Sequence, residues 1–176
     1  MEVNKYKMNK PDPNPKNLPS KHENDKKNND IFKSFVFDQP AKGESVEISI
    51  PKSPNFRDLA RVRLVIDNIT NRVFLTSTIG WGATAGTPNV LFSIYRRRQA
   101  FGTEEQIFYT VDQANGTDSA NTSFTLVDDI PVLTQEQQLI EYVVRVRIIS
   151  PGNNDAADVV GPIILTAAEI GANPTN

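Results

Sequence analysis

Few side chains in this sequence could carry acid–base, nucleophilic or metal chemistry. Histidine occurs once, as His22 in a stretch dominated by Lys, Asn and Pro, and cysteine is absent. A Ser-His-Asp triad and histidine-based zinc sites need histidine on the folded part of a chain, and thiolate chemistry needs cysteine, so neither class of site is predicted. The stretch GWGATAG at 80–86 lacks the Lys-Ser/Thr pair of a phosphate-binding loop and precedes no helical pattern, so we expect a flexible loop there. We therefore predict that the protein is not an enzyme and uses no cofactor.

Carboxylates gather at Asp128-Asp129 and at Asp155 with Asp158. Calcium loops place ligands at alternate positions and end on a glutamate, which neither group matches, so we predict no metal site and keep a structural calcium ion at the second group as an alternative. The run 96–98, three arginines, ends a predicted strand. Because alternate residues of a strand point to opposite faces, at most two of these arginines share a patch, which suits a guarded sheet edge or an interface rim.

Trp81 stands between two glycines at the end of a predicted strand. It could be an exposed platform for a sugar or a protein partner, together with Tyr95 or Tyr109, but our main interpretation is a tryptophan that caps the core. The net charge of −2 and a pI near 5.5 give no basic patch for nucleic acid or an anionic membrane. No apolar run approaches the roughly 20 residues that cross a bilayer. We expect neither nucleic acid nor membrane as a partner.

From residue 31 onward apolar residues recur with a period of two, which is typical of half-buried strands. Turn-forming Gly, Pro, Asn and Asp separate eight predicted strands, at 45–50, 61–67, 73–79, 90–97, 106–112, 121–128, 139–149 and 159–166. Pro162 in the last of these implies an edge position or a bulge. Single helical turns are expected at most at 134–138 and 167–170. The pattern predicts an all-β fold, an antiparallel eight-stranded jelly-roll β-sandwich with an extended N-terminal arm.

The N-terminal part divides into two segments. Residues 1–30, rich in Lys, Asn and Pro, have too little apolar surface to fold alone and form an extended or disordered leader. Residues 31–40 form an apolar connector strand, and residues 41–176 form the sandwich. We predict that the strand is a subunit interface that completes the sheet of a neighbouring copy, since about 30 extended residues reach roughly 100 Å. The predicted interface residues are Ile31, Phe32, Phe35, Val36 and Phe37. The alternative is a ninth strand that pairs within its own sandwich.

This layout of leader, connector strand and sandwich ending in IILTAAEI resembles the subunits of Bacillus endospore appendages. The thick appendage families carry connector cysteines, which this chain lacks, so it is most similar to the thin, exosporium-attached F-type subunits, or to another exosporium surface protein with a tumour-necrosis-factor-like jelly roll. The resemblance implies a head-to-tail homo-oligomeric fibre outside the cell on the spore surface, with an anchoring protein there as a further partner. A phage or virus structural jelly roll and a carbohydrate-binding β-sandwich are the alternatives.

Overall fold

The computed structural model describes residues 32–41, 47–98, 102–129, 138–149 and 151–171. Regular structure within these ranges is entirely strand, and no helix among them is long and apolar enough to cross a membrane. The strands are β1 (Phe32–Ala41), β2 (Ile48–Ser49), β3 (Arg57–Ile66), β4 (Arg72–Ala85), β5 (Asn89–Arg98), β6 (Glu105–Gln113), β7 (Ser119–Asp128), β8 (Gln138–Ile149) and β9 (Ala156–Ile170).

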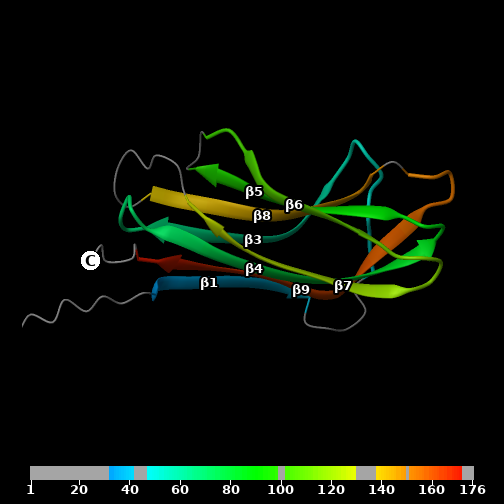
Figure 1. The fold of residues 1–176 in the computed structure, drawn as a ribbon, viewed down its shortest axis with the longest axis horizontal. Coiled ribbons are helices and arrows are strands. Elements are labelled where there is room, and N and C mark those ends of the chain that lie inside the picture. The colour runs from blue at the N-terminus through cyan, green and yellow to red at the C-terminus, as the bar shows by residue number, and fades with distance from the viewer. Residues whose placement is uncertain (1–31, 42–46, 99–101, 130–137, 150, 172–176) are drawn as a thin grey trace, which may run out of the picture.

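These strands form two antiparallel sheets stacked face to face (Figure 1). The five-stranded sheet has the order β1-β9-β4-β7, with β2 also paired to β9, and the four-stranded sheet has the order β3-β8-β5-β6. The ladders nest around the β5–β6 hairpin, because β4 pairs with β7, β3 with β8 and β1 with β9. A long hairpin rolled up in this way is a jelly roll, and the predicted fold class is confirmed.

The eight long strands are not the eight predicted ones. Of the segment predicted as a strand at 45–50, the described residues 47–50 contribute the two-residue β2, and β1 supplies the eighth long strand of the jelly roll. The loop predicted at 80–86 is wrong, because β4 continues through Trp81 and Ala83, which keep the inward alternation. The helical turn predicted at 167–170 is also wrong, since these residues belong to β9. The turn predicted at 134–138 lies almost wholly outside the described residues.

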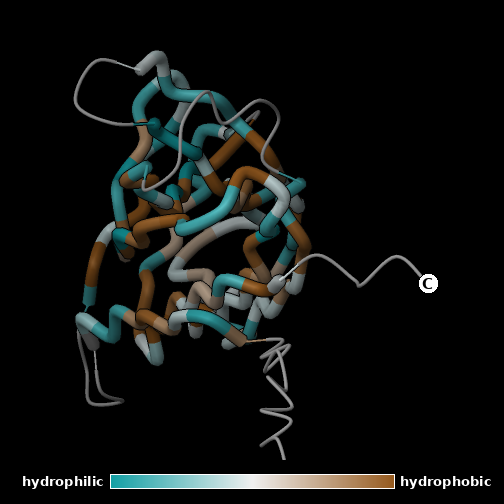
Figure 2. The backbone as a smooth tube through the Cα atoms, turned by 90° about the vertical axis from the view of Figure 1, so that its left-hand side faces the viewer, coloured by the Kyte–Doolittle hydropathy of each residue, from teal (hydrophilic) through white to brown (hydrophobic). Residues whose placement is uncertain are grey.

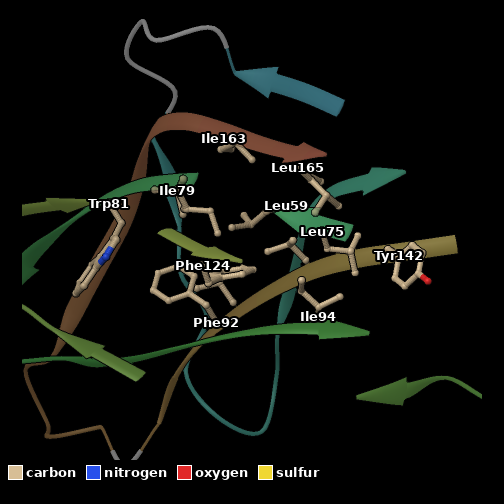
Figure 3. Close-up of a cluster of buried hydrophobic side chains, with 14 of the residues drawn as sticks. Leu59, Leu75, Ile79, Trp81, Phe92, Ile94, Phe124, Tyr142, Ile163 and Leu165 are labelled. Carbon is tan, nitrogen blue, oxygen red and sulfur yellow. The ribbon is translucent and has the colours of Figure 1, made fainter. Parts of the chain in front are cut away.

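The core lies between the sheets and is built from the inward phase of each strand. Viewed from the end of the molecule, apolar and polar segments alternate along the chain in both layers (Figure 2). The inward residues predicted for 139–149 are confirmed, because every second residue from Ile140 to Ile148 is buried. Figure 3 shows how this core is filled from both sheets, by Leu75, Ile79, Trp81 and Leu165 on one side and Phe92, Ile94 and Tyr142 on the other.

The proline in β9 lies at a bulge. Ile79 pairs with Ile163 and Trp81 with Val159, so residues 160–162 of β9 stand opposite Gly80 alone. A Cβ atom on Gly80 would lie 1.9 Å from the carbonyl oxygen of Gly161, and Gly161 has a φ of 86°, which favours glycine. The bulge predicted from Pro162 is confirmed, whereas the edge position is not, because β9 lies between β1 and β4.

Trp81 links the two sheets where β6 and β7 come together. Its side chain is 0% exposed, and its Nε1 donates to Thr122 Oγ1 at 2.9 Å. Thr122 Oγ1 in turn donates to Asp112 Oδ2 at 2.7 Å, which connects β4 and β7 of one sheet to β6 of the other. The interpretation of Trp81 as a core residue is confirmed, and an exposed Trp81 platform is wrong.

We expect Thr122→Val to lower the free energy of unfolding by about 1–3 kcal/mol, because it leaves the Trp81 N–H buried without an acceptor. Urea unfolding followed by the fluorescence of the single tryptophan measures this change. Thr125→Val, at an exposed site three residues further along β7, is the matched control and should stay within about 0.5 kcal/mol of the parent protein. Equal losses in both variants would contradict a specific role for the Trp81–Thr122–Asp112 chain.

Candidate assembly surface on the first strand

β1 is the edge strand of the five-stranded sheet, and in the single chain it pairs with β9 of the same sandwich. This position agrees with the alternative interpretation from the sequence, in which the strand pairs within its own sandwich. The register shift between Phe32 and Ser34 adds one residue to β1, so Phe32 points to the same side as Phe35 and Phe37. Pairing of β1 with β9 of a second copy would involve two chains, and it stays a prediction.

The phenylalanines of β1 point away from the core. Phe32, Phe35 and Phe37 are 67%, 61% and 65% exposed, and the rings of Phe35 and Phe37 lie 6.2 Å apart. Val36 points the other way and packs against the core. Ile31, the fifth predicted interface residue, lies outside the described residues. The strand therefore places one of these four apolar side chains inside the sandwich and three outside it.

Two polar side chains of β1 anchor its inward side. Ser34 Oγ donates to Glu169 Oε2 at 3.3 Å, and Asp38 Oδ2 accepts the backbone N–H of Arg61 in β3 at 2.8 Å. The second bond joins the edge of one sheet to the edge of the other. Ser34, Val36 and Asp38 alternate, so one face of β1 carries all three inward contacts.

Glu169 is a fully buried carboxylate that holds this corner together. Its Oε1 accepts the backbone N–H of Asp67 at 2.9 Å and Nδ2 of Asn71 at 2.6 Å, while Oε2 accepts the Ser34 hydroxyl. Since a buried carboxylate is costly unless its oxygens are satisfied, these three donors fix where β1, β9 and the β3–β4 turn meet. The sequence does signal this residue, because Glu169 continues the inward alternation of Leu165 and Ala167.

The three consecutive arginines separate as strand alternation requires. Arg96 points inward and is only 2% exposed, with Nη1 donating to Asp128 Oδ1 and Nη2 to Glu105 Oε2, both at 2.6 Å. Tyr142 donates to the second oxygen of Asp128 at 2.8 Å. Burial disfavours the charge of Arg96, but the bonds and charges of Glu105 and Asp128 outweigh this and raise its pKa. Burial, with the nearby charge of Asp128, also raises the pKa of Tyr142, so its hydroxyl stays protonated and donates to the Arg96–Asp128 ion pair.

A second ionic cluster covers the outer face of the four-stranded sheet. Arg145 donates from Nε to Asp58 at 2.6 Å and from both Nη atoms to Glu104, at 2.6 and 2.9 Å. Its guanidinium carbon also lies 4.4 and 4.6 Å from the ring centroids of Phe56 and Tyr95. Tyr95 is thus occupied by this cluster. Tyr109 is exposed on the same sheet, while Trp81 is buried between the sheets, so the predicted sugar-binding aromatics do not come together.

Besides Asp128, two of the aspartates singled out in the sequence have structural partners. Asp155 accepts the backbone N–H of Thr87 at 3.0 Å and of Gly152 at 2.6 Å, which lowers its pKa and fixes two neighbouring turns. Asp129 pairs with Arg72 at 2.8 Å. Among the described residues, no three His, Cys, Asp or Glu side chains group as metal ligands would.

No protein-family model matches the chain, and no curated protein matches it. Solved structures with a similar arrangement include one of the infectious bursal disease virus Gx strain, with 11% identity, a TM-score of 0.45, and coverage of 80% of this chain and 32% of the viral chain. Eiger TNF from S. frugiperda has 11% identity, a TM-score of 0.45, and coverage of 82% and 99%. A CBM4 structure has 10% identity, a TM-score of 0.30, and coverage of 79% and 92%. This chain spans about a third of the viral chain, and such distant likenesses carry no information about activity or partners.

We expect Val36→Ala to destabilise the single chain by about 1–2 kcal/mol, because Val36 is the apolar side chain that β1 places against the core. Phe35→Thr should change the free energy of unfolding by no more than about 0.5 kcal/mol, because the larger Phe35 side chain is already in solvent. Urea unfolding measures both, and amide exchange over residues 32–41 reports the strand itself. A larger loss from Phe35→Thr than from Val36→Ala would contradict the observed facing of β1.

The Arg145 cluster predicts an acid-sensitive contribution to stability. Hydrogen bonds from Arg145, partly opposed by burial, lower the pKa of Glu104 below its ordinary value of 4.5. A carboxyl whose pKa is lower in the folded state stabilises the fold above its unfolded pKa, and this contribution is lost as the pH falls through the folded value. Glu104→Gln should therefore flatten the decline of unfolding free energy below about pH 4.5. A decline as steep as that of the parent protein would contradict this assignment.

Proposed function

We propose that this protein is a structural subunit that assembles with copies of itself by exchanging β1, so that β1 of one copy pairs with β9 of the next. The observation that carries the proposal is the way β1 is held: it is an N-terminal edge strand with one backbone ladder, one inward apolar side chain and two polar anchors. Each of these contacts is available on the neighbouring β9 and β3 edges of any other copy.

The geometry limits which copy can accept the strand. The leader at 1–30 lies on the N-terminal side of β1, whereas the rest of the sandwich follows β1 in the chain. The leader's extended length of roughly 100 Å therefore does not set the distance between a sandwich and the β1 strand that it donates. That distance depends on the chain between Ala41 and Glu47, which spans at most about 20 Å. The acceptor is therefore a subunit in direct contact, and the leader of the donor continues onto the acceptor's side.

Exchange costs little in contacts, because the same ladder and the same anchors form between copies as within one. A reciprocal exchange closes into a dimer, whereas a head-to-tail exchange leaves one β9 edge and one β1 strand open at the ends and so extends into a fibre. The arrangement of an N-terminal strand added to a sheet edge is a recurrent mode of protein assembly.

The identity of the assembly follows the resemblance noted above. A subunit of this layout suits a spore-surface fibre located outside the cell and attached to the exosporium through an anchoring protein. A viral shell or tail is the second kind of assembly that a jelly roll with an exchanged arm could build, and it needs the same strand exchange. Both are non-enzymatic roles.

Exchange can be tested with cysteines, since the natural chain has none. Val36 pairs with Ala167 across the β1–β9 ladder. We expect a mixture of Val36→Cys chains and Ala167→Cys chains, refolded together and oxidised, to form a disulfide between positions 36 and 167 of different chains, found by peptide mass spectrometry. A mixture of Val36→Cys with Thr125→Cys, on β7 at the far edge of the sheet, is the matched control.

If β1 stays in its own sandwich, the 36–167 mixture will give no more cross-link than the control, and the proposal fails. Negative-stain microscopy then identifies the kind of assembly. Full-length protein should form fibres, and closed particles would favour the viral alternative.

A further inference from the structure

The outer face of the five-stranded sheet carries an apolar row that crosses four strands. Phe35 of β1 pairs with Ala168 of β9, Ala168 with Phe74 of β4, and Phe74 with Val127 of β7. Phe32 and Ile170 extend this row on one side, and Phe37 on the other. We call this surface, centred on Phe35, Phe74 and Val127, the aromatic face.

Polar groups next to the aromatic face are already bonded to one another. Thr76 and Thr166, in the row of Phe37, share a hydroxyl hydrogen bond of 2.6 Å, and Thr78 and Ser123 share one of 3.1 Å. The charges at the other end of the face, Arg72 and Asp129, form an ion pair of 2.8 Å. Covering this surface would therefore leave few polar groups without partners, which lowers the cost of removing it from water.

The outer face of the other sheet differs in kind. It carries the Arg145 cluster and a second group in which Arg61, Arg63 and Arg97 surround Glu141. Such charged surfaces are expensive to bury, whereas contiguous exposed apolar patches of a few hundred Å² on a protein mark interaction sites. The outer face of the four-stranded sheet also exposes Val65, Tyr109, Val111 and Leu139, so the ion-pair groups around Glu141 and Arg145 of β8 are what distinguish it from the aromatic face.

The area of the aromatic face matches what a pair of copies needs. A phenylalanine buries about 150–250 Å² when fully covered, so three that are about two-thirds exposed offer roughly 300–500 Å². Phe74, Val127 and Ile170 add to this area. Two such faces together come close to the lower end of a stable interface, about 1,200 Å² in total.

We propose that the aromatic face packs against the same face of a second copy. A face that is apolar along its centre and has its charges paired at the end is complementary to itself, as a two-fold interface requires. Two twisted sheets can pack in this way with their strands about 30° apart. The contact does not depend on the proposed exchange, since β1 presents the same phenylalanines on its own sandwich or on a neighbour's. Within fibres it would join subunits side by side.

The test uses a chain in which exchange is blocked. The double variant Val36→Cys/Ala167→Cys, oxidised at high dilution, ties β1 to its own β9. We expect this locked chain to form a dimer in sedimentation equilibrium, and Phe35→Thr/Phe37→Thr in the locked chain to raise the dimer dissociation constant by at least about tenfold. Phe74→Thr/Val127→Thr, on strands that are never exchanged, should weaken the dimer as well. Tyr109→Thr, an exposed aromatic on the opposite sheet, is the control and should leave the dimer unchanged.

A locked chain that stays monomeric overturns the proposal, as does a dimer that Tyr109→Thr weakens as much as Phe35→Thr/Phe37→Thr. An unchanged dimer dissociation constant in Phe74→Thr/Val127→Thr also overturns the proposal, because the contact would then be confined to the edge strand β1. Circular dichroism and urea unfolding of each variant separate a lost contact from a lost fold. The same Phe35→Thr/Phe37→Thr change should leave the inter-chain 36–167 disulfide intact, so failure of this proposal and failure of strand exchange give different results.

Discussion

The rest of this molecule depends on one requirement: the backbone groups along the outer edge of β9 need hydrogen-bond partners. β9 is the strand on which the five-stranded sheet is built, because it pairs with β4 on one side and with β1 and β2 on the other. Without β1, backbone groups from Ile163 to Ile170 would lose their partners, and the buried carboxylate of Glu169 would lose one of its donors. The fold therefore needs a strand at that edge, but it needs only the backbone and one face of that strand.

Polar side chains close the sandwich at both of its open edges. Asp38 bonds the backbone of Arg61 where β1 meets β3, and the Trp81–Thr122–Asp112 chain joins the sheets where β7 meets β6. At one end of the core, Arg96, Asp128 and Tyr142 tie β5, β7 and β8 together. These bonds connect the sheets at set positions, so they fix the register of one sheet on the other, which apolar packing alone specifies less sharply.

Much of the fold could be predicted from the sequence because inward alternation is regular over long strands. It places Val62, Ile79, Phe92 and Val144 in the core, and it signals the bulge at Pro162. The alternation does not show that β1, and not the segment at 45–50, is the long strand paired with β9. A run of alternating residues gives no indication of how many of them form backbone hydrogen bonds with a neighbouring strand. The alternation also left Arg96, Asp128 and Glu169 without an assigned role, because it can place a charged residue inward but does not identify the partners on distant strands that bind it.

The sequence shows where the apolar strand β1 lies, but it does not show which of its side chains point into the core and which point to solvent. Phe35, Val36 and Phe37 are consecutive, so either face of the strand could be the apolar one, and hydrophobic area alone would bury the two phenylalanines. A shift of one residue would do this, but it would turn Ser34 and Asp38 away from Glu169 and from the N–H of Arg61. Leaving a buried carboxylate and an edge N–H without these partners costs free energy, while Phe35 and Phe37 can be covered later by another surface. The polar anchors thus select the register within the chain, and the exposed phenylalanines are the consequence that another subunit can satisfy.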